Sequence, residues 1–109
     1  MDFNEYQDQN QHTAIYPNLG NNIYYPALGL ASEAGEVAGK IKKIMRDDND
    51  IVSDAKKEEL KKELGDVLWY VSQLATELKL DLNDIAQCNI DKLASRLARH
   101  QIGGSGDDR

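Results

Sequence analysis

The chain is poor in cysteine and proline and has no long apolar run, and each scarcity excludes a class of protein. A single cysteine cannot form an internal disulfide and is too little for a cysteine-rich zinc site. A membrane-spanning helix needs about 20 consecutive apolar residues, and the sequence has no such stretch. The N-terminal residues lack the apolar core of a signal peptide, so we expect a cytoplasmic protein without a membrane partner.

Basic residues are also the minority charge, with 13 Lys and Arg against 19 Asp and Glu. Proteins that coat nucleic acid need clustered positive charge, so we expect no nucleic-acid polymer as a partner. The length of 109 residues and the 40% hydrophobic content are typical of one folded domain. We expect this domain over residues 1–102, followed by a flexible tail over residues 103–109, which is rich in glycine.

Apolar residues recur at helical spacing between Pro26 and Gly103, a stretch without proline. No run alternates with the period of two that would predict a strand. Four helices are predicted, over about residues 4–13, 27–45, 53–79 and 81–100, with a turn at residues 47–50. Each helix has one apolar side and must pack on its neighbours. The predicted fold is all-α, a four-helix bundle-like protomer with a central antiparallel helix hairpin.

Two pairs of acidic residues lie on the second and third predicted helices. Glu33 and Glu36 are spaced i, i+3, as are Glu63 and Asp66, so each pair shares one helix face. A turn near Asn49 folds the two helices antiparallel. Glu36 and Glu63 lie at nearly equal sequence distances from this turn, as do Glu33 and Asp66. We therefore expect the four carboxylates to meet across the hairpin.

Four carboxylates at a partly buried edge repel one another unless a cation neutralises them. Oxygen ligands alone favour Mg²⁺, with Mn²⁺ as a possible substitute, and the lack of nearby His or Cys argues against zinc. Magnesium held in this way commonly binds phosphate oxygens, so attack of water on a phosphoanhydride is the expected reaction. The alternative is that these four are ordinary solvated acids among the 19 of the chain.

The chain resembles the MazG-like nucleoside triphosphate pyrophosphohydrolases of the all-α NTP pyrophosphatase superfamily in the segments GLASEAGEVAGKIKKIMRD, KKELGDVLWYVSQLA and NIDKLASR. The family's signature is Glu-x-x-Glu, a spacer and Glu-x-x-Asp. The resemblance implies that the matching residues bind Mg²⁺ and act in catalysis: Glu33, Glu36, Glu63 and Asp66. It also implies cleavage of a (d)NTP between the α- and β-phosphates to (d)NMP and pyrophosphate, in nucleotide-pool housekeeping. Some relatives carry another Glu before the first motif Glu, proposed as general base, where this chain has Ser32.

Candidate substrate-binding residues lie on the fourth predicted helix, where Asn89, Lys92 and Arg96 share one edge. The two basic side chains could clamp a triphosphate, and their spacing resembles the family's late motif. The alternative for both is that they only complement the negative end of the helix dipole.

Aromatic residues offer a second set of candidates. Trp69 lies away from the apolar side of the third predicted helix, and three environments are open: another subunit, a nucleobase or the N-terminal segment. Tyr70 lies on the acidic side of the same helix and could line the pocket. Five more aromatics precede Pro26, and packing is their favoured role, with a share in a base pocket as the alternative: Phe3, Tyr6, Tyr16, Tyr24 and Tyr25.

A strip of small residues opposite the apolar side of the second helix indicates a second packed face: Ser32, Gly35 and Gly39. One chain cannot cover both faces, so we expect a homo-oligomer, either a dimer or a tetramer. Two alternatives to the proposed enzyme are open, a non-catalytic helical oligomerisation module and a superfamily branch specific for dUTP, dCTP or phosphoribosyl-ATP. The sequence leaves base preference, sugar preference and the number of metal ions open.

Overall fold

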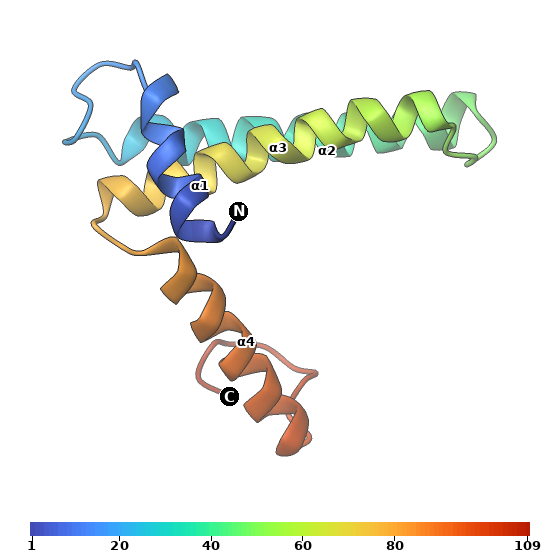
Figure 1. Ribbon diagram of the computed structural model, residues 1–109. Coiled ribbons are helices and arrows are strands. Elements are labelled where there is room, and N and C mark those ends of the chain that lie inside the picture. The colour runs from blue at the N-terminus through green and yellow to red at the C-terminus, as the bar shows by residue number, and fades with distance from the viewer.

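The computed structural model describes residues 1–109 as an all-helical chain, with 70% of its residues in helices and no strand. The elements in order are α1 (Phe3–Asn10), the 3-10 helix η1 (Gln11–Thr13), α2 (Tyr24–Asp47), α3 (Asp54–Glu77) and α4 (Leu82–Ala98) (Figure 1). The predicted all-α class is confirmed, and the helices lie close to their predicted bounds. None of them combines the length and the apolarity that crossing a membrane requires.

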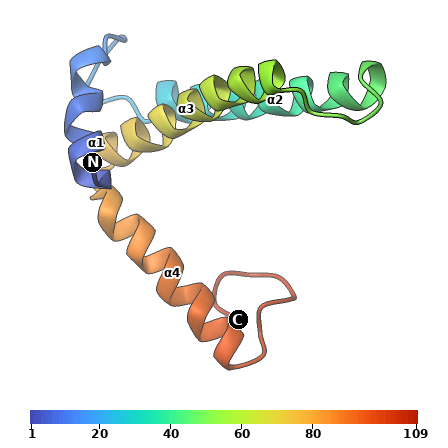
Figure 2. The same ribbon diagram turned by 45° about the vertical axis from the view of Figure 1, so that its right-hand side comes forward.

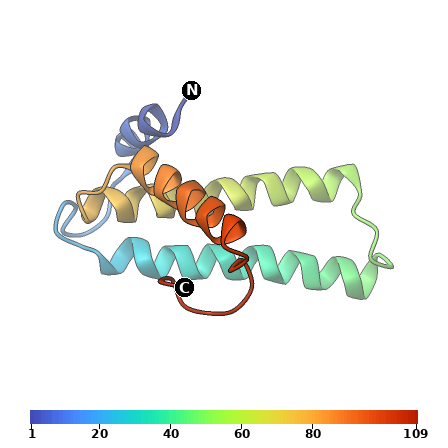
Figure 3. The same ribbon diagram turned by 90° about the horizontal axis from the view of Figure 1, so that it is seen from below.

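Helices α2 and α3 form the central hairpin and lie side by side along most of their length (Figure 3). The turn between them places Asn49 at φ 52° and Asp50 at φ 63°, left-handed conformations that Asn and Asp tolerate better than most residues. Ser53 then caps α3 by accepting a hydrogen bond from the Lys56 amide at 3.2 Å. The predicted turn is confirmed, except that Asp47 is the last residue of α2.

Helix α1 packs against α3 and against the start of α4, and Gln7 makes three hydrogen bonds there. Its amide nitrogen donates to Thr76 Oγ1 at 3.1 Å and to the Leu80 carbonyl at 2.9 Å. Its side-chain oxygen accepts from the Leu82 amide at 2.9 Å. These bonds satisfy backbone groups that would otherwise lack partners at the junction of α3 and α4. Gln7 therefore fixes the point from which α4 departs.

Helix α4 points away from the hairpin after this junction (Figures 1 and 2). Leu82 at its start is only 3% exposed, whereas Ile90 and Leu97 are 61% and 66% exposed. The apolar side predicted for this helix is therefore covered at its N-terminal end and open along the rest. Apolar surface left in water forgoes about 25 cal/mol per Å², which favours a partner for this face. The homo-oligomer stays a prediction.

Candidate functional site

Three acidic side chains meet across the hairpin. Glu33 of α2 and Glu63 and Asp66 of α3 each offer a carboxylate oxygen, and these oxygens lie within 4.8 Å of one another. Glu33 and Glu63 are half-buried, and Asp66 is exposed. Glu36, the fourth predicted ligand, is exposed and lies outside this close group. The antiparallel hairpin thus brings together three of the four carboxylates that the spacing singled out.

The charges in this group are poorly compensated. Burial raises the pKa of Glu33, and the neighbouring carboxylates of Asp66, Glu63 and Glu36 raise it further. The nearest basic group is the Lys40 ammonium, 3.9 Å from Glu63 Oε1 and also 3.9 Å from Glu59. A shared and partly exposed ion pair of this length compensates little charge. A set of oxygen donors with excess negative charge suits a divalent cation such as Mg²⁺.

A cavity of about 360 Å³ opens beside the acidic group. Two of the three carboxylates lie on its wall, and the rest of the wall is mostly aromatic. Its lining residues are Thr13, Ile15, Tyr16, Tyr25, Glu33, Asp66, Trp69 and Tyr70. The acidic group and the cavity therefore form one site, with a charged side on the hairpin and an aromatic side that includes the N-terminal segment.

The aromatic side is a chain of four rings. Tyr16 stacks on Tyr25 with ring centroids 4.6 Å apart and planes 11° apart. Tyr25 lies 6.4 Å from Tyr70, and Tyr70 meets Trp69 edge to face at 5.0 Å. The lack of a side chain at Gly29 of α2 leaves room for the ring of Tyr70, because a Cβ at that position would overlap the ring. Burial, followed by the neighbouring Tyr25, Glu33 and Asp66, raises the pKa of Tyr70, so its phenol stays protonated.

Trp69 occupies one of the three environments that the sequence left open. Its indole nitrogen donates to Thr13 Oγ1 at 2.8 Å, so the side chain packs against the N-terminal segment while it lines the cavity. Tyr70 lines the same cavity, as its position on the acidic side of the helix suggested. Among the five early aromatics, Tyr16 and Tyr25 reach the cavity wall. Their contact with a nucleobase stays a prediction.

A buried polar network behind the aromatic wall was missed by the sequence analysis. The Tyr16 hydroxyl donates to Glu77 Oε1 at 2.8 Å and accepts from Gln73 Nε2 at 2.8 Å. Gln73 is 1% exposed and Glu77 is 9% exposed. The spacing i, i+4 of these polar residues beside apolar Leu74 and Ala75 could have indicated a buried pair. The sequence offered no means of finding their partner, which lies in a distant loop.

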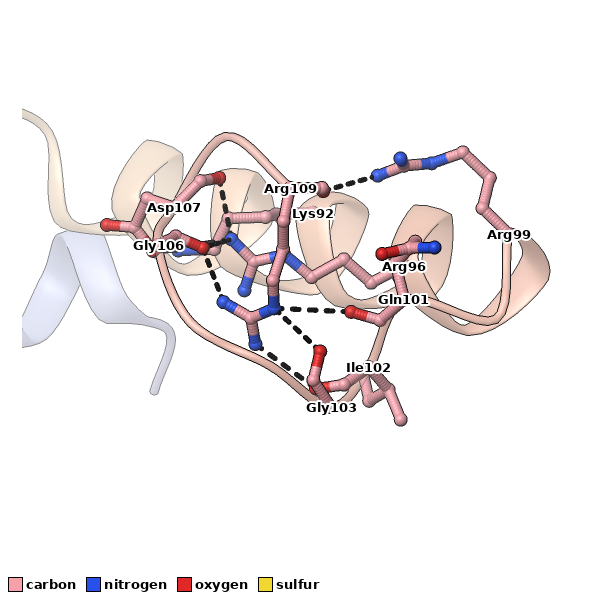
Figure 4. Close-up of polar contacts among 9 residues, drawn as sticks. All are labelled: Lys92, Arg96, Arg99, Gln101, Ile102, Gly103, Gly106, Asp107 and Arg109. Carbon is pink, nitrogen blue, oxygen red and sulfur yellow. Dashed lines mark hydrogen bonds and ion pairs between the residues drawn. The ribbon is translucent and has the colours of Figure 1, made fainter.

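The candidate residues of α4 do not reach the cavity within one chain. Asn89 is exposed, and the cations of Lys92 and Arg96 turn to the segment 103–109 (Figure 4). Lys92 Nζ lies 3.1 Å from Asp107 Oδ1, and Arg96 Nη2 donates to the Asp107 carbonyl at 2.6 Å. In the structure this segment folds back over α4. Its flexibility and the phosphate contacts of the three α4 residues stay predictions.

Residues 26–100 match the MazG nucleotide pyrophosphohydrolase domain. The chain belongs to the MazG family. The matched region includes α3, α4, nearly all of α2 and the three close carboxylates. The chain is also 45% identical over 109 residues to the Gene 37 protein of Mycobacterium phage L5, covering 95% of this chain and 96% of that protein. No solved structure matches the chain.

Family membership makes this chain a nucleotide pyrophosphohydrolase in general terms. MazG domains are typically metal-dependent, and the acidic group of Glu33, Glu63 and Asp66 is a place where a metal ion could bind. The aromatic wall of the cavity depends in part on residues that precede the MazG match, namely Thr13, Ile15, Tyr16 and Tyr25.

Proposed function

We propose that this MazG protein is a Mg²⁺-dependent nucleoside triphosphate pyrophosphohydrolase. It cleaves a (d)NTP between the α- and β-phosphates and releases (d)NMP and pyrophosphate, as part of nucleotide-pool housekeeping. The observation that supports this most directly is the position of the acidic group on the wall of an aromatic cavity. Phosphates need charge compensation at one end of the substrate, and a planar base needs ring faces at the other.

In this proposal Glu33, Glu63 and Asp66 hold the metal, and Glu36 completes the set from the same helix as Glu33. The oxygen-only donors and the raised pKa of Glu33 fit a hard divalent cation, with Mn²⁺ as a substitute. When bound, Mg²⁺ neutralises phosphate charge and makes water easier to deprotonate. Position 32 holds a serine instead of the glutamate of some relatives, so one of these carboxylates accepts the proton from the attacking water.

The aromatic residues position the nucleoside in this proposal. Cavities that bind small ligands commonly enclose about 300–1,000 Å³, and this one lies at the lower end of that range with about 360 Å³. Tyr25, Trp69 and Tyr70 offer ring faces or edges to a planar base. Stacking on an aromatic side chain contributes roughly 1–3 kcal/mol per base in nucleic-acid complexes, so these rings supply a large share of the binding energy.

Lys92 and Arg96 provide the positive charge for the triphosphate, with Asn89 as a polar contact beside them. Because α4 points away from its own hairpin, these residues serve the cavity of a second copy in a homo-oligomer, a dimer or a tetramer. The exposed apolar side of α4, which includes Ile90 and Leu97, supports this arrangement. Contact with the triphosphate then replaces the contact of both cations with Asp107.

The test is pyrophosphate release from a panel of the common NTPs and dNTPs together with dUTP and phosphoribosyl-ATP, with Mg²⁺, with Mn²⁺ and after EDTA. Glu33→Gln and Glu63→Gln each remove a metal ligand. Because losing even an outer-shell partner of a metal site costs roughly 10–100-fold, we expect each variant to lose about 100-fold or more in kcat/KM. Glu58→Gln on α3 is the matched control, because Glu58 is exposed and makes no side-chain hydrogen bond or ion pair. Unchanged turnover in both ligand variants would contradict the proposal.

The same panel separates the alternatives. A preference for dUTP or dCTP, or activity on phosphoribosyl-ATP, would assign the chain to a more specific branch of the superfamily. Activity on none of these compounds, combined with a stable oligomer, would favour a non-catalytic oligomerisation module. The exposed apolar side of α4 is the observation that keeps this second function open.

A further inference from the structure

Glu77 is a buried carboxylate that no basic side chain compensates. Its side chain lies at the C-terminal end of α3, is only 9% exposed and takes part in no ion pair. Burying a charge is costly unless hydrogen bonds replace the lost water. Burial alone would raise the pKa of Glu77, but hydrogen bonds from Tyr16, Gly20 and Asn22 outweigh it and lower the pKa. The carboxylate is therefore ionised at neutral pH, and both of its oxygens accept hydrogen bonds.

All three donors to Glu77 come from one loop, residues 14–23, which connects η1 to α2. The Tyr16 hydroxyl and the Gly20 amide donate to Glu77 Oε1, each at 2.8 Å, and the Asn22 amide donates to Oε2 at 3.3 Å. Within itself the loop has few bonds, such as the one from Asn22 Nδ2 to the Pro17 carbonyl at 2.8 Å. One carboxylate on α3 is therefore the main external anchor of a loop without regular structure.

The anchored loop shapes the cavity by two routes. The hydroxyl of Tyr16 is held by Glu77, and the ring of Tyr16 stacks on Tyr25 in the cavity wall. The Asn22 side chain accepts from the Tyr24 and Tyr25 amides at 3.1 and 3.0 Å, which ties the start of α2 to the same loop. Burial and the neighbouring Glu77 raise the pKa of Tyr16 to about 12, so its hydroxyl remains a donor at neutral pH. The hydroxyl already donates to Glu77 and accepts from Gln73, so the ring is the part of Tyr16 that contacts a ligand.

We propose that Glu77 is a positioning residue for recognition of the nucleotide base, an inference that rests on the proposed function. Glu77 lies neither in the acidic group nor on the cavity wall. It acts through Tyr16 and Asn22, whose positions set the ring faces of Tyr16 and Tyr25. A substrate with a base depends on Glu77, and a triphosphate without a base does not.

The kinetic test compares a nucleoside triphosphate with methyl triphosphate, which has the same reacting bond and no base. Glu77→Gln keeps the size of the side chain but replaces one acceptor oxygen by a donor, which leaves a loop donor unpaired. We expect kcat/KM for the nucleotide to fall about 10-fold, mainly through KM, because base stacking is weakened. For methyl triphosphate we expect a change of less than about twofold. Equal losses on both substrates would show a merely structural role and overturn the proposal.

Two further variants keep this comparison interpretable. Glu58→Gln makes the same chemical change on α3 without touching the loop, so both substrates should react as with the unaltered chain. Tyr16→Phe keeps the ring but removes the hydroxyl that donates to Glu77. If Glu77→Gln does not fold, judged by circular dichroism, Tyr16→Phe is expected to show the same selective rise in the KM of the nucleotide. A Tyr16→Phe enzyme with unchanged KM for the nucleotide would then overturn the proposal.

A binding measurement tests the same point without turnover. Trp69 is the only tryptophan and lines the cavity, so its fluorescence reports on a base bound there. Titration with a nucleoside monophosphate in EDTA should quench this fluorescence, with an affinity about 10-fold lower in Glu77→Gln. Equal affinities, or no quenching in the unaltered chain, would contradict a role of Glu77 in base recognition. Absence of hydrolysis alone would contradict the proposed function and leave the fluorescence result standing as an independent test.

Discussion

Replacing Gly29 by alanine should disturb the aromatic wall without touching any charged group. The added Cβ would overlap the ring of Tyr70, which is held between Tyr25 and Trp69 and has to shift. Overpacking of this kind costs about 1–3 kcal/mol. Alanine in place of glycine inside a helix returns about 1 kcal/mol. The net loss for Gly29→Ala is therefore only about 0–2 kcal/mol, and a reference variant is needed to isolate the overlap.

Gly65→Ala provides that reference, because a Cβ at Gly65 in the middle of α3 meets no atom within 4 Å. This variant should gain about 1 kcal/mol, so the two variants should differ by about 1–3 kcal/mol in urea unfolding. In a domain of this size, 1 kcal/mol corresponds to roughly 4–8 °C in Tm. Displacement of Tyr70 should also raise the KM for nucleotides about 10-fold in Gly29→Ala. A Gly29→Ala protein as stable as Gly65→Ala, with an unchanged KM, would refute this account of the wall.

Two further outcomes follow from the charges and the open face of α4. The pKa of Glu33 is raised in the folded chain above its ordinary value of 4.5, so folding favours the protonated carboxyl. The stability that this difference contributes is present below pH 4.5 and is lost as the pH rises through the raised pKa. In EDTA the Tm should therefore fall over that pH interval. Mg²⁺ at about 100 times its Kd should add roughly 2.7 kcal/mol to the free energy of unfolding at neutral pH and remove this decline in Tm. A pH dependence of the Tm that Mg²⁺ leaves unchanged would contradict the metal site. Ile90→Glu and Leu97→Glu should reduce the oligomer size measured by light scattering, because each puts a charge on the exposed apolar side of α4, and an unchanged mass in both would exclude this face as the interface.

The parts of the fold that depend on neighbouring residues were predictable from the sequence. Helix periodicity gave the helices, and the cluster of Asp and Asn residues gave the turn, whose left-handed positions are Asn49 and Asp50. The convergence of Glu33 with Glu63 and Asp66 followed from their spacing and from one antiparallel turn. Each of these inferences needs only the geometry of a regular helix and one reversal of the chain.

The parts that depend on distant residues were not predictable. Tyr16 and Glu77 are 61 positions apart, and nothing local marks them as partners. The direction of α4 is set at its junction with α3, where Lys79 adopts φ 60° and Gln7 from α1 satisfies the backbone of Leu80 and Leu82. The amphipathic pattern of α4 shows which side of the helix is apolar and favours burial, but it does not show in which direction the helix points. For that reason the sequence could not show that Lys92 and Arg96 lie apart from the cavity of their own chain.

The border of the family match passes through the candidate site. Trimming the chain to residues 26–100 would keep all the acidic residues of the candidate site and discard Thr13, Ile15, Tyr16 and Tyr25 from the cavity. The acidic group thus lies wholly inside the matched region, whereas the aromatic wall is divided, with Trp69 and Tyr70 inside it and Tyr16 and Tyr25 before it. Under the proposed function, a relative that differs only in its first 25 residues would keep the acidic group and present a different half of the aromatic wall to the base.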